Sequence, residues 1–492
     1  MENTWLYLTR LAVQLVTAFG LLPWLARQLF GQRIAAVMAL TWKAAFRFRL
    51  FIVITVLLLA TVVGLPLLIK DDGTARGFTQ ILLTYTLSSI TGLLGLSTLW
   101  LACGTLARDI EECQMQMVAV KPIARWQIWL GKWLGLMSLN AALLAISGLS
   151  VFLILQWRAT QLPPVEQRIL RNEVLVARAS ARPPTMEKQI ELETENQLRA
   201  ALEKNSHLTP AEVAQLRQQI REGLKAYVQN VPPGYEQSWK IDLGFAKNFL
   251  QDQPLYLRVK FNTSVKSASG TFPVLWLVGV PKETQLWRTE EPMSLAPDTF
   301  HEFVVPPNLF DKEGILTVTV VNPNNTALLF TMEDGIEVLY RDGGFALNFA
   351  RGIGIIFCWM ALLAALGLAA ASFLSFPVAA FVSLAMLLVV FSTGTLKAVV
   401  SEGTIMSYNQ ETGTRGSPLD IVAVPIFKVI LSVINLAKDF SPIDQLSAGR
   451  SITWVELARA VVQIILVLGG ILAAFGIWAF TRRELATAQS QS

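Results

Sequence analysis

Residues 50–69 read LFIVITVLLLATVVGLPLLI, a run without a single charged side chain. A helix needs about 20 predominantly apolar residues to cross the roughly 30 Å of hydrocarbon in a lipid bilayer. Because the bilayer core holds no water, the backbone polar groups of such a run must pair with one another, which favours a helix. The stretch therefore predicts a membrane-spanning helix.

Five further stretches share this composition. Arg459 is the one charged residue within the six stretches, and it stands where the last begins, so its long side chain can reach the membrane interface. The 492-residue chain is 16% charged, whereas soluble domains carry about 25% charged residues. We therefore expect an α-helical polytopic membrane protein with six transmembrane helices, at residues 50–69, 81–106, 133–155, 353–376, 377–396 and 457–480.

Basic residues indicate how these helices are oriented. Cytoplasmic loops of membrane proteins are enriched in Lys and Arg. Six crossings put the regions before the first span, between the second and third, and after the last on one side. The termini, including the tail 481–492, and the segment 107–132 are therefore expected in the cytoplasm. The basic residues in these regions are Arg10, Arg27, Arg33, Lys43, Arg47 and Arg49, then Arg108, Lys121, Arg125 and Lys132, then Arg482 and Arg483.

Residues 1–49 are predicted to form amphipathic helices in the inner membrane interface. Residues 11–30 are apolar, but polar and basic residues interrupt them, which argues against a crossing. An interfacial helix carries its apolar side chains on one face. In residues 34–49 such a stripe is formed by Ile34, Val37, Met38 and Trp42.

A second ambiguous stretch, 419–436, lies between the fifth and sixth spans. It is apolar but contains Asp420, Pro425 and Lys428. We interpret it as partly inserted outer helices. They lie within the second membrane block, 352–480, which holds the fourth to sixth spans, as the first block, 50–155, holds the first three. A seventh or eighth crossing is the alternative.

The region 156–351 then falls outside the cytoplasm as an inserted α+β domain. Residues 164–230 are predicted to be polar helix. Residues 234–340 change to a period of two, as where Leu255, Leu257 and Val259 alternate with polar side chains. Short alternating runs separated by turn residues are typical of an antiparallel β-sandwich.

Composition excludes several function classes. The three cysteines lie outside the inserted domain, so neither a disulfide framework nor a cysteine metal site is expected there. The two histidines, His207 and His301, are separated in sequence, and no span has a carboxylate in its body, so we expect no catalytic or metal site. The net charge of +5 comes with basic residues beside the spans rather than on one basic face, so nucleic acid is not an expected partner.

The segment 107–132 is acidic first and basic later. Three acidic residues follow the second span, and a Pro break leads to a basic, Trp-rich run that opens the third span. One interpretation is an inter-helix loop anchored by Trp126, Trp129 and Trp133. The other is a helix–break–helix that offers both charge signs to a cytoplasmic partner. The residues concerned are Asp109, Glu111, Glu112, Pro122, Arg125, Gly131 and Lys132.

This order of features resembles the permease subunits of the type-2 ABC exporter family (ABC-2). There an acidic stretch after the second span leads to a Pro-x-x-Arg and Gly-Lys run, which this chain supplies as Pro122, Arg125, Gly131 and Lys132. The basic helix before the first span, the broken apolar stretch before the sixth and the Arg482-Arg483-Glu484-Leu485 end also match. The resemblance covers the membrane residues and not the inserted domain, which many members lack.

The resemblance implies a dimeric export pathway, as a homodimer or with a related permease, in the bacterial inner (plasma) membrane. It assigns the segment 109–132 to docking a separate cytoplasmic ABC ATPase. The chain has no Gly-x-x-x-x-Gly-Lys-Ser/Thr phosphate loop, so we expect ATP to be used by the partner and no cofactor to be bound by this chain.

The alternative function is a membrane-anchored envelope binding or assembly protein. Its β-sandwich would recruit an envelope partner or a glycan, and a candidate ligand face is formed by Tyr256, Trp276 and Trp287, with Phe300 nearby in sequence. Aromatic residues in a sandwich are more often core. Six spans are more than an anchor needs, which favours the permease.

Overall fold

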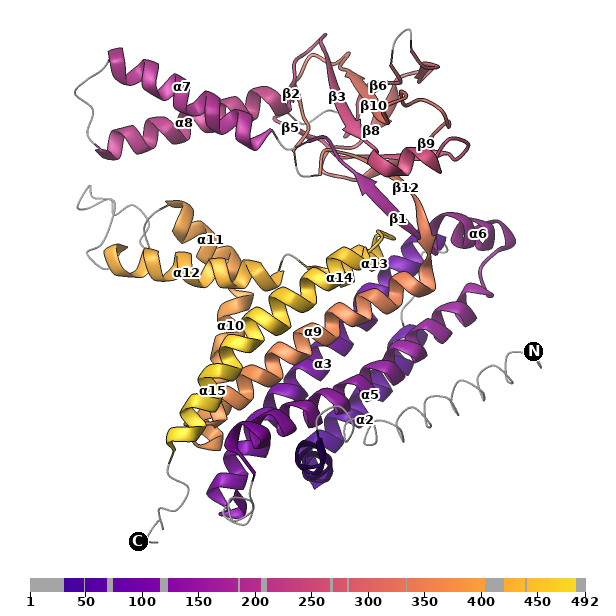
Figure 1. Ribbon diagram of the computed structural model, residues 1–492. Coiled ribbons are helices and arrows are strands. Elements are labelled where there is room, and N and C mark those ends of the chain that lie inside the picture. The colour runs from indigo at the N-terminus through magenta and orange to yellow at the C-terminus, as the bar shows by residue number, and fades with distance from the viewer. Residues whose placement is uncertain are drawn as a thin grey trace. The chain divides into compact units, whose positions relative to one another are not determined.

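Figure 1 shows the computed structural model of the chain, which forms two compact units. The helical unit holds the chain up to Ala177 and again from Gly343 onward, and the β unit is Arg178–Asp342. The structure describes residues 31–47, 49–68, 74–115, 123–184, 186–204, 210–265, 269–280, 283–332, 334–402, 420–438 and 440–483.

Long apolar helices build the helical unit. Among the described residues, five helical segments are long and apolar enough to cross a membrane. They coincide with five of the six predicted spans, so these stretches are confirmed as helices. The segments are α2 (Arg49–Leu68), α3 (Ala75–Glu111), α5 (Arg125–Ala159), α9 (Phe345–Ala371) and the run of α14 (Trp454–Ala460), the π-helix η3 (Val461–Gly469) and α15 (Gly470–Arg482).

The predicted span 377–396 is not one straight helix. It is divided between α10 (Phe376–Phe391) and α11 (Thr393–Glu402), which meet at an angle of 60°. At the break, the hydroxyl groups of Ser392 and Thr393 donate to the carbonyl oxygens of Leu388 and Val390, and such bonds bend helices. With its 16 residues α10 is about 24 Å long at 1.5 Å per residue, so by itself it is shorter than the roughly 30 Å of hydrocarbon in a bilayer.

Small residues let α3 and α9 pack closely. A methyl group added at Gly367 would lie 2.7 Å from Cβ of Ala102, so this position has no room for a side chain. Close approach through small residues is the usual way that apolar helices associate in lipid. Trp133 of α5 donates from Nε1 to the carbonyl oxygen of Ala361 on α9, at 3.1 Å. In Figure 1 these helices and α15 run side by side.

The two ends of this bundle are connected differently. The end of α3, the start of α5, the turn from α9 to α10 and the end of α15 lie together at one end. At the other end, Glu166 of α6 (Pro164–Ile169) accepts a hydrogen bond from the backbone N–H of Ala75 at 2.7 Å. The chain leaves the helical unit there, after the π-helix η1 (Leu170–Val174), and returns at the start of α9.

The predicted pair of outer helices at 419–436 is instead one helix, α12 (Asp420–Lys438), which packs against α11 (Figure 1). Pro425 removes one backbone donor near its start, but the helix continues beyond it. The short helix α13 (Pro442–Ser447) lies against α3 and α9, where Leu446 fills the space above Gly352. The predicted helix at 11–30 lies outside the described residues.

Antiparallel strand pairs form the β unit. One sheet has the order β1-β12-β4-β9, the second has β3-β10-β6-β7 with β8 also paired to β6, and a small third sheet has β2-β11-β5. A 3-10 helix, η2 (Gly244–Asn248), follows β3. The strands are β1 (Val176–Ala181), β2 (Asn230–Val231), β3 (Glu236–Asp242), β4 (Leu255–Val259), β5 (Asn262–Thr263), β6 (Phe272–Val278), β7 (Trp287–Arg288), β8 (Met293–Leu295), β9 (His301–Val305), β10 (Ile315–Val321), β11 (Leu328–Leu329) and β12 (Ile336–Gly344).

The core between the two large sheets follows the predicted alternation. Leu255, Leu257 and Val259 of β4 are buried, while the residues between them are only half-buried. Apolar residues of β6 and β10 enter the same core from the second sheet. The expected antiparallel β region is therefore confirmed, with its sheets packed face to face.

The prediction of polar helix throughout 164–230 is wrong at β1. The segment Val176–Ala181 pairs with β12 as an edge strand of the first sheet. Its alanines favour a helix in isolation, but sheet pairing outweighs that local preference. The remainder forms a helical hairpin of α7 (Glu187–Lys204) and α8 (Pro210–Gln229), in which Arg217 pairs with Glu191 at 2.7 Å.

Candidate functional site

The candidate site is the end of the helical unit where α3 connects to α5. Asp109 and Glu111 lie in the last turn of α3, and Glu112 is the residue that ends it. Arg125, Gly131 and Lys132 lie in the first turns of α5, and Pro122 lies outside the described residues. Of the charged members of this set, Arg125 and Glu111 bind the ends of other helices, and Lys132 pairs with Asp109.

Lys132 is buried between α5 and α3. Its side chain is 5% exposed, and Nζ donates to Oδ2 of Asp109 at 2.5 Å and to the carbonyl oxygen of Thr105 at 2.7 Å. Buried charges are tolerated where they are paired and hydrogen-bonded. The ion pair therefore holds the end of α3 against the start of α5.

Arg125 holds the start of α5 to the end of α15. Its Nη1 donates to the carbonyl oxygens of Phe480, Thr481 and Arg483, at 2.6, 2.8 and 2.8 Å. The last carbonyl groups of a helix have no partner within the helix, and a cation there interacts favourably with the helix dipole. One guanidinium group thus caps α15 from a neighbouring helix.

Glu111 makes the complementary contact at a helix start. Its Oε1 accepts a hydrogen bond from the backbone N–H of Phe376, the first residue of α10, at 2.8 Å. A carboxylate at a helix N-terminus is favoured by the helix dipole. Arg108 lies over the ring of Phe376, 4.4 Å from its centroid. Arg483 donates to the carbonyl oxygens of Ala371 and Leu374, both at 3.3 Å, at the turn from α9 to α10.

Only some of the predicted residues are exposed to solvent at this end of the helical unit. Glu111 and Glu112 remain exposed, and Glu112 accepts a hydrogen bond from Gln114 at 2.7 Å. Trp126, in the first turn of α5, is 47% exposed. These side chains are therefore accessible to a partner, whereas Lys132 is not.

Gly131 has a packing role that the sequence reading missed. A Cβ atom at Gly131 would lie 2.7 Å from Cβ of Val37, and one at Gly135 would lie 2.7 Å from Cβ of Thr41. The two glycines thus let the helix 31–47 rest directly on α5. The spacing Gly131-x-x-x-Gly135 within an apolar run was the available signal for such a contact.

The predicted membrane-facing stripe of this first helix needs correction. Ile34, Val37 and Met38 are buried within the helical unit, and Trp42 donates from Nε1 to Oγ of Ser138 on α5 at 2.7 Å. The stripe packs on protein because the glycines of α5 leave room for it.

The candidate ligand residues of the β unit do not share one face. Trp276 is completely buried in the core, and Trp287 is stacked on Phe303 with ring centroids 6.0 Å apart. Tyr256 points to the outer face of the first sheet, where Arg178 lies 5.5 Å from its ring centroid. The buried Trp276 is a core residue.

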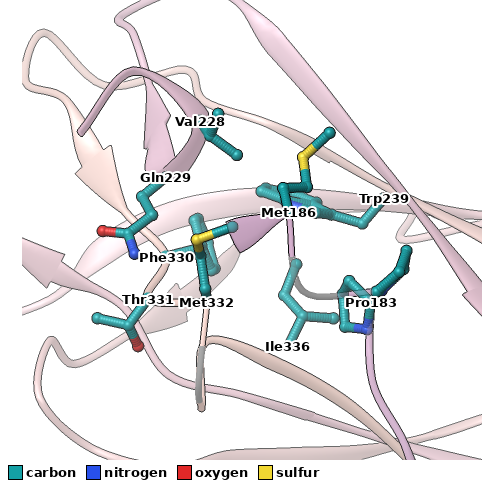
Figure 2. Close-up of a pocket in the computed structure, with 10 residues that line it drawn as sticks. Pro183, Met186, Val228, Gln229, Trp239, Phe330, Thr331, Met332 and Ile336 are labelled. Atoms are coloured by element: carbon teal, nitrogen blue, oxygen red, sulfur yellow. The ribbon is translucent and has the colours of Figure 1, made fainter. Parts of the chain in front are cut away.

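A small hollow does open between the helical hairpin and the second sheet. Figure 2 shows Pro183, Met186, Trp239, Phe330 and Met332 around it, with Gln229 and Thr331 as its polar groups. Its volume of about 30 Å³ is far below the roughly 300–1,000 Å³ of a drug-sized ligand pocket. Among the described residues, no group of three or more His, Cys, Asp or Glu side chains could hold a metal ion.

Comparison with known proteins gives no relative to set beside this geometry: no protein-family model, curated protein or solved structure matches the chain.

Proposed function

We propose that this chain is the transmembrane permease subunit of an ABC transporter of the ABC-2 exporter class. Two such subunits, identical or related, form the export pathway, and separate ATPase subunits dock at the connection between α3 and α5. The β unit lies on the far side of the membrane and receives or selects the substrate or a partner.

A transmembrane arrangement is supported by where exposed aromatic residues lie on the long helices. Trp126 and Trp478 are exposed at the end that holds the α3–α5 connection, and Trp157 and Trp454 are exposed at the other. Trp and Tyr are enriched at both membrane interfaces. At the α-helical rise of 1.5 Å per residue, Trp454 and Trp478 are at most about 36 Å apart along their helix, which is close to the thickness of the hydrocarbon core.

The observation that carries the proposal is the set of contacts that join the α3–α5 connection to other helices. Arg125 holds the end of α15, Glu111 holds the start of α10, and Lys132 holds α3 to α5. A partner that pushes or pulls on this connection would therefore act on several candidate spans at once. Energetic coupling between distant sites travels through such packed and hydrogen-bonded contacts.

The proposal predicts an ABC ATPase gene next to the gene of this chain, and copurification of that ATPase with this chain tests it. The variants Glu112→Lys and Trp126→Ala alter exposed side chains and leave the inter-helix contacts intact. We expect the ATPase to copurify with the wild type and to be lost from both variants. Glu313→Lys, at an exposed position of the β unit, is the matched control and should retain it. Equal recovery of the ATPase with all four proteins would refute docking at this site.

A further inference from the structure

The helix 31–47 has two different faces. The face toward α5 carries the buried stripe of Ile34, Val37 and Met38. The opposite face carries residues at helical spacing that are all exposed, namely Arg33, Ala36, Leu40, Lys43 and Arg47. Since the apolar stripe is used for packing on α5, the face left open is basic, with an aliphatic residue at its centre.

The basic side chains on this open face, Arg33, Lys43 and Arg47, have no acidic partner among the residues that the structure describes. The sequence also has no Asp or Glu between Glu2 and Asp71. Exposed basic residues are usually just solvated, but a run of this length without one acidic residue is suited to a polyanionic surface.

Two features identify that surface as lipid rather than an acidic protein. Leu40 is 54% exposed among the basic residues, and Phe46 is 56% exposed beside them. The helix is followed at once by α2, which exposes apolar side chains such as Val53 and Val56. Basic residues mixed with Leu and Phe on one helix, next to an apolar span, are typical of a helix at an anionic membrane surface.

We propose that the open face of helix 31–47 binds the phosphate headgroups of anionic lipids in the leaflet where α2 begins. The inference rests on the membrane-spanning part of the proposed function and not on ATPase docking or transport. The Gly131 and Gly135 contacts fix the helix on α5, so bound lipid would also hold the start of α5.

The expected strength follows from the number of charges. Each Lys or Arg near an anionic leaflet increases affinity by about fivefold. Removing Arg33, Lys43 and Arg47 together should therefore weaken binding of anionic lipid by at least about tenfold, even if the contributions overlap. The interaction should also weaken as salt screens exposed charges.

The test compares lipids retained by the purified full chain. The protein is reconstituted in vesicles of phosphatidylcholine and phosphatidylglycerol in equal parts and extracted in mild detergent, and the retained lipids are quantified by mass spectrometry. The open-face variant combines Arg33→Gln, Lys43→Gln and Arg47→Gln. The control variant removes three exposed charges of the β unit, by Lys240→Gln, Arg288→Gln and Lys312→Gln.

We expect the wild type and the control variant to retain phosphatidylglycerol preferentially, and the open-face variant to lose that preference. The thermal midpoint of the open-face variant in phosphatidylcholine alone should equal that of the wild type, which excludes misfolding. An unchanged lipid preference in the open-face variant would overturn the proposal. So would an open-face variant that keeps the lipid preference but loses a copurifying protein. ATPase copurification is scored separately, so failure of one proposal leaves the other standing.

Discussion

Lys132 and Asp109 are separated by the whole α3–α5 connection in sequence, yet Nζ of the first lies 2.5 Å from Oδ2 of the second. Lys132 is almost fully buried, whereas the side chain of Asp109 is 27% exposed. The two partners therefore depend on each other unequally. Water can reach Asp109 if Lys132 is removed, but it cannot easily reach Lys132 if Asp109 is removed.

Asp109→Asn should consequently destabilise the protein more than Lys132→Met. Removing one partner of a buried ion pair costs about 3–5 kcal/mol, and the part-exposed site lowers this to about 2–3 kcal/mol for Asp109→Asn. The double variant should be more stable than Asp109→Asn alone, because no buried ammonium group is left without a carboxylate. Thermal midpoints of the purified chain in detergent measure this. Simple addition of the two single effects would show that the pair is not coupled.

Arg125→Lys should loosen the end of α15 while keeping the charge. All three hydrogen bonds come from Nη1 at the tip of the arginine side chain, and a lysine ammonium, on a shorter and more flexible stem, would reach and hold that position less well. Hydrogen exchange of the backbone amides at 479–483 should become several-fold faster. Arg482→Lys is the control, since Arg482 lies over the ring of Trp478. Equal exchange in the two variants would contradict a capping role for Arg125.

Sequence periodicity predicted the main elements because burial acts on long, uniform stretches. The uncharged runs became helices, and the alternation around Leu257 and Val318 became buried strand faces. Such patterns need no knowledge of the partner segment. They fail for a short segment whose conformation depends on the strand with which it pairs. Val176–Ala181 is such a segment, since it pairs with β12, which is distant in sequence.

The acidic and basic residues of the α3–α5 connection were also recognised in sequence, but not their partners. Nothing local indicates that Arg125 reaches the carbonyl oxygen of Phe480 or that Glu111 reaches the N–H of Phe376, because these contacts join residues hundreds of positions apart. The stripe of Ile34 and Val37 was assigned to the membrane for the same reason. An apolar face predicts burial without naming what covers it.

Gly131→Ala and Gly135→Ala should release the helix 31–47 from α5. The added methyl groups would meet Val37 and Thr41 at 2.7 Å, which is too close for either side to remain in place. Trypsin should then cut after Lys43 and Arg47 faster than in the wild type, as followed by mass spectrometry of the N-terminal fragments. Gly92→Ala on α3 is the matched control, because apart from the adjoining backbone of α3 itself nothing lies within 4 Å of the added methyl group. Unchanged cleavage in the α5 variants would show that the glycines do not position this helix.

Asp334→Asn should remove a pH-dependent contribution to the stability of the β unit. Burial raises the pKa of Asp334, but the hydroxyl of Thr331 and the charges of Lys260, 3.4 Å away, and Arg182 outweigh it, so the pKa is lowered. A lowered pKa means that the ionised form stabilises the fold above the unfolded value of about 3.9, and that this stabilisation is lost as the pH falls through the folded value. Because Asp334 is 35% exposed, solvent limits the effect to about 1 kcal/mol.

Thermal midpoints of the full chain should therefore differ between wild type and Asp334→Asn at neutral pH and converge in acid. Asp252→Asn, at an exposed position, should follow the wild type throughout, and a constant difference across the pH range would exclude the assigned pKa shift.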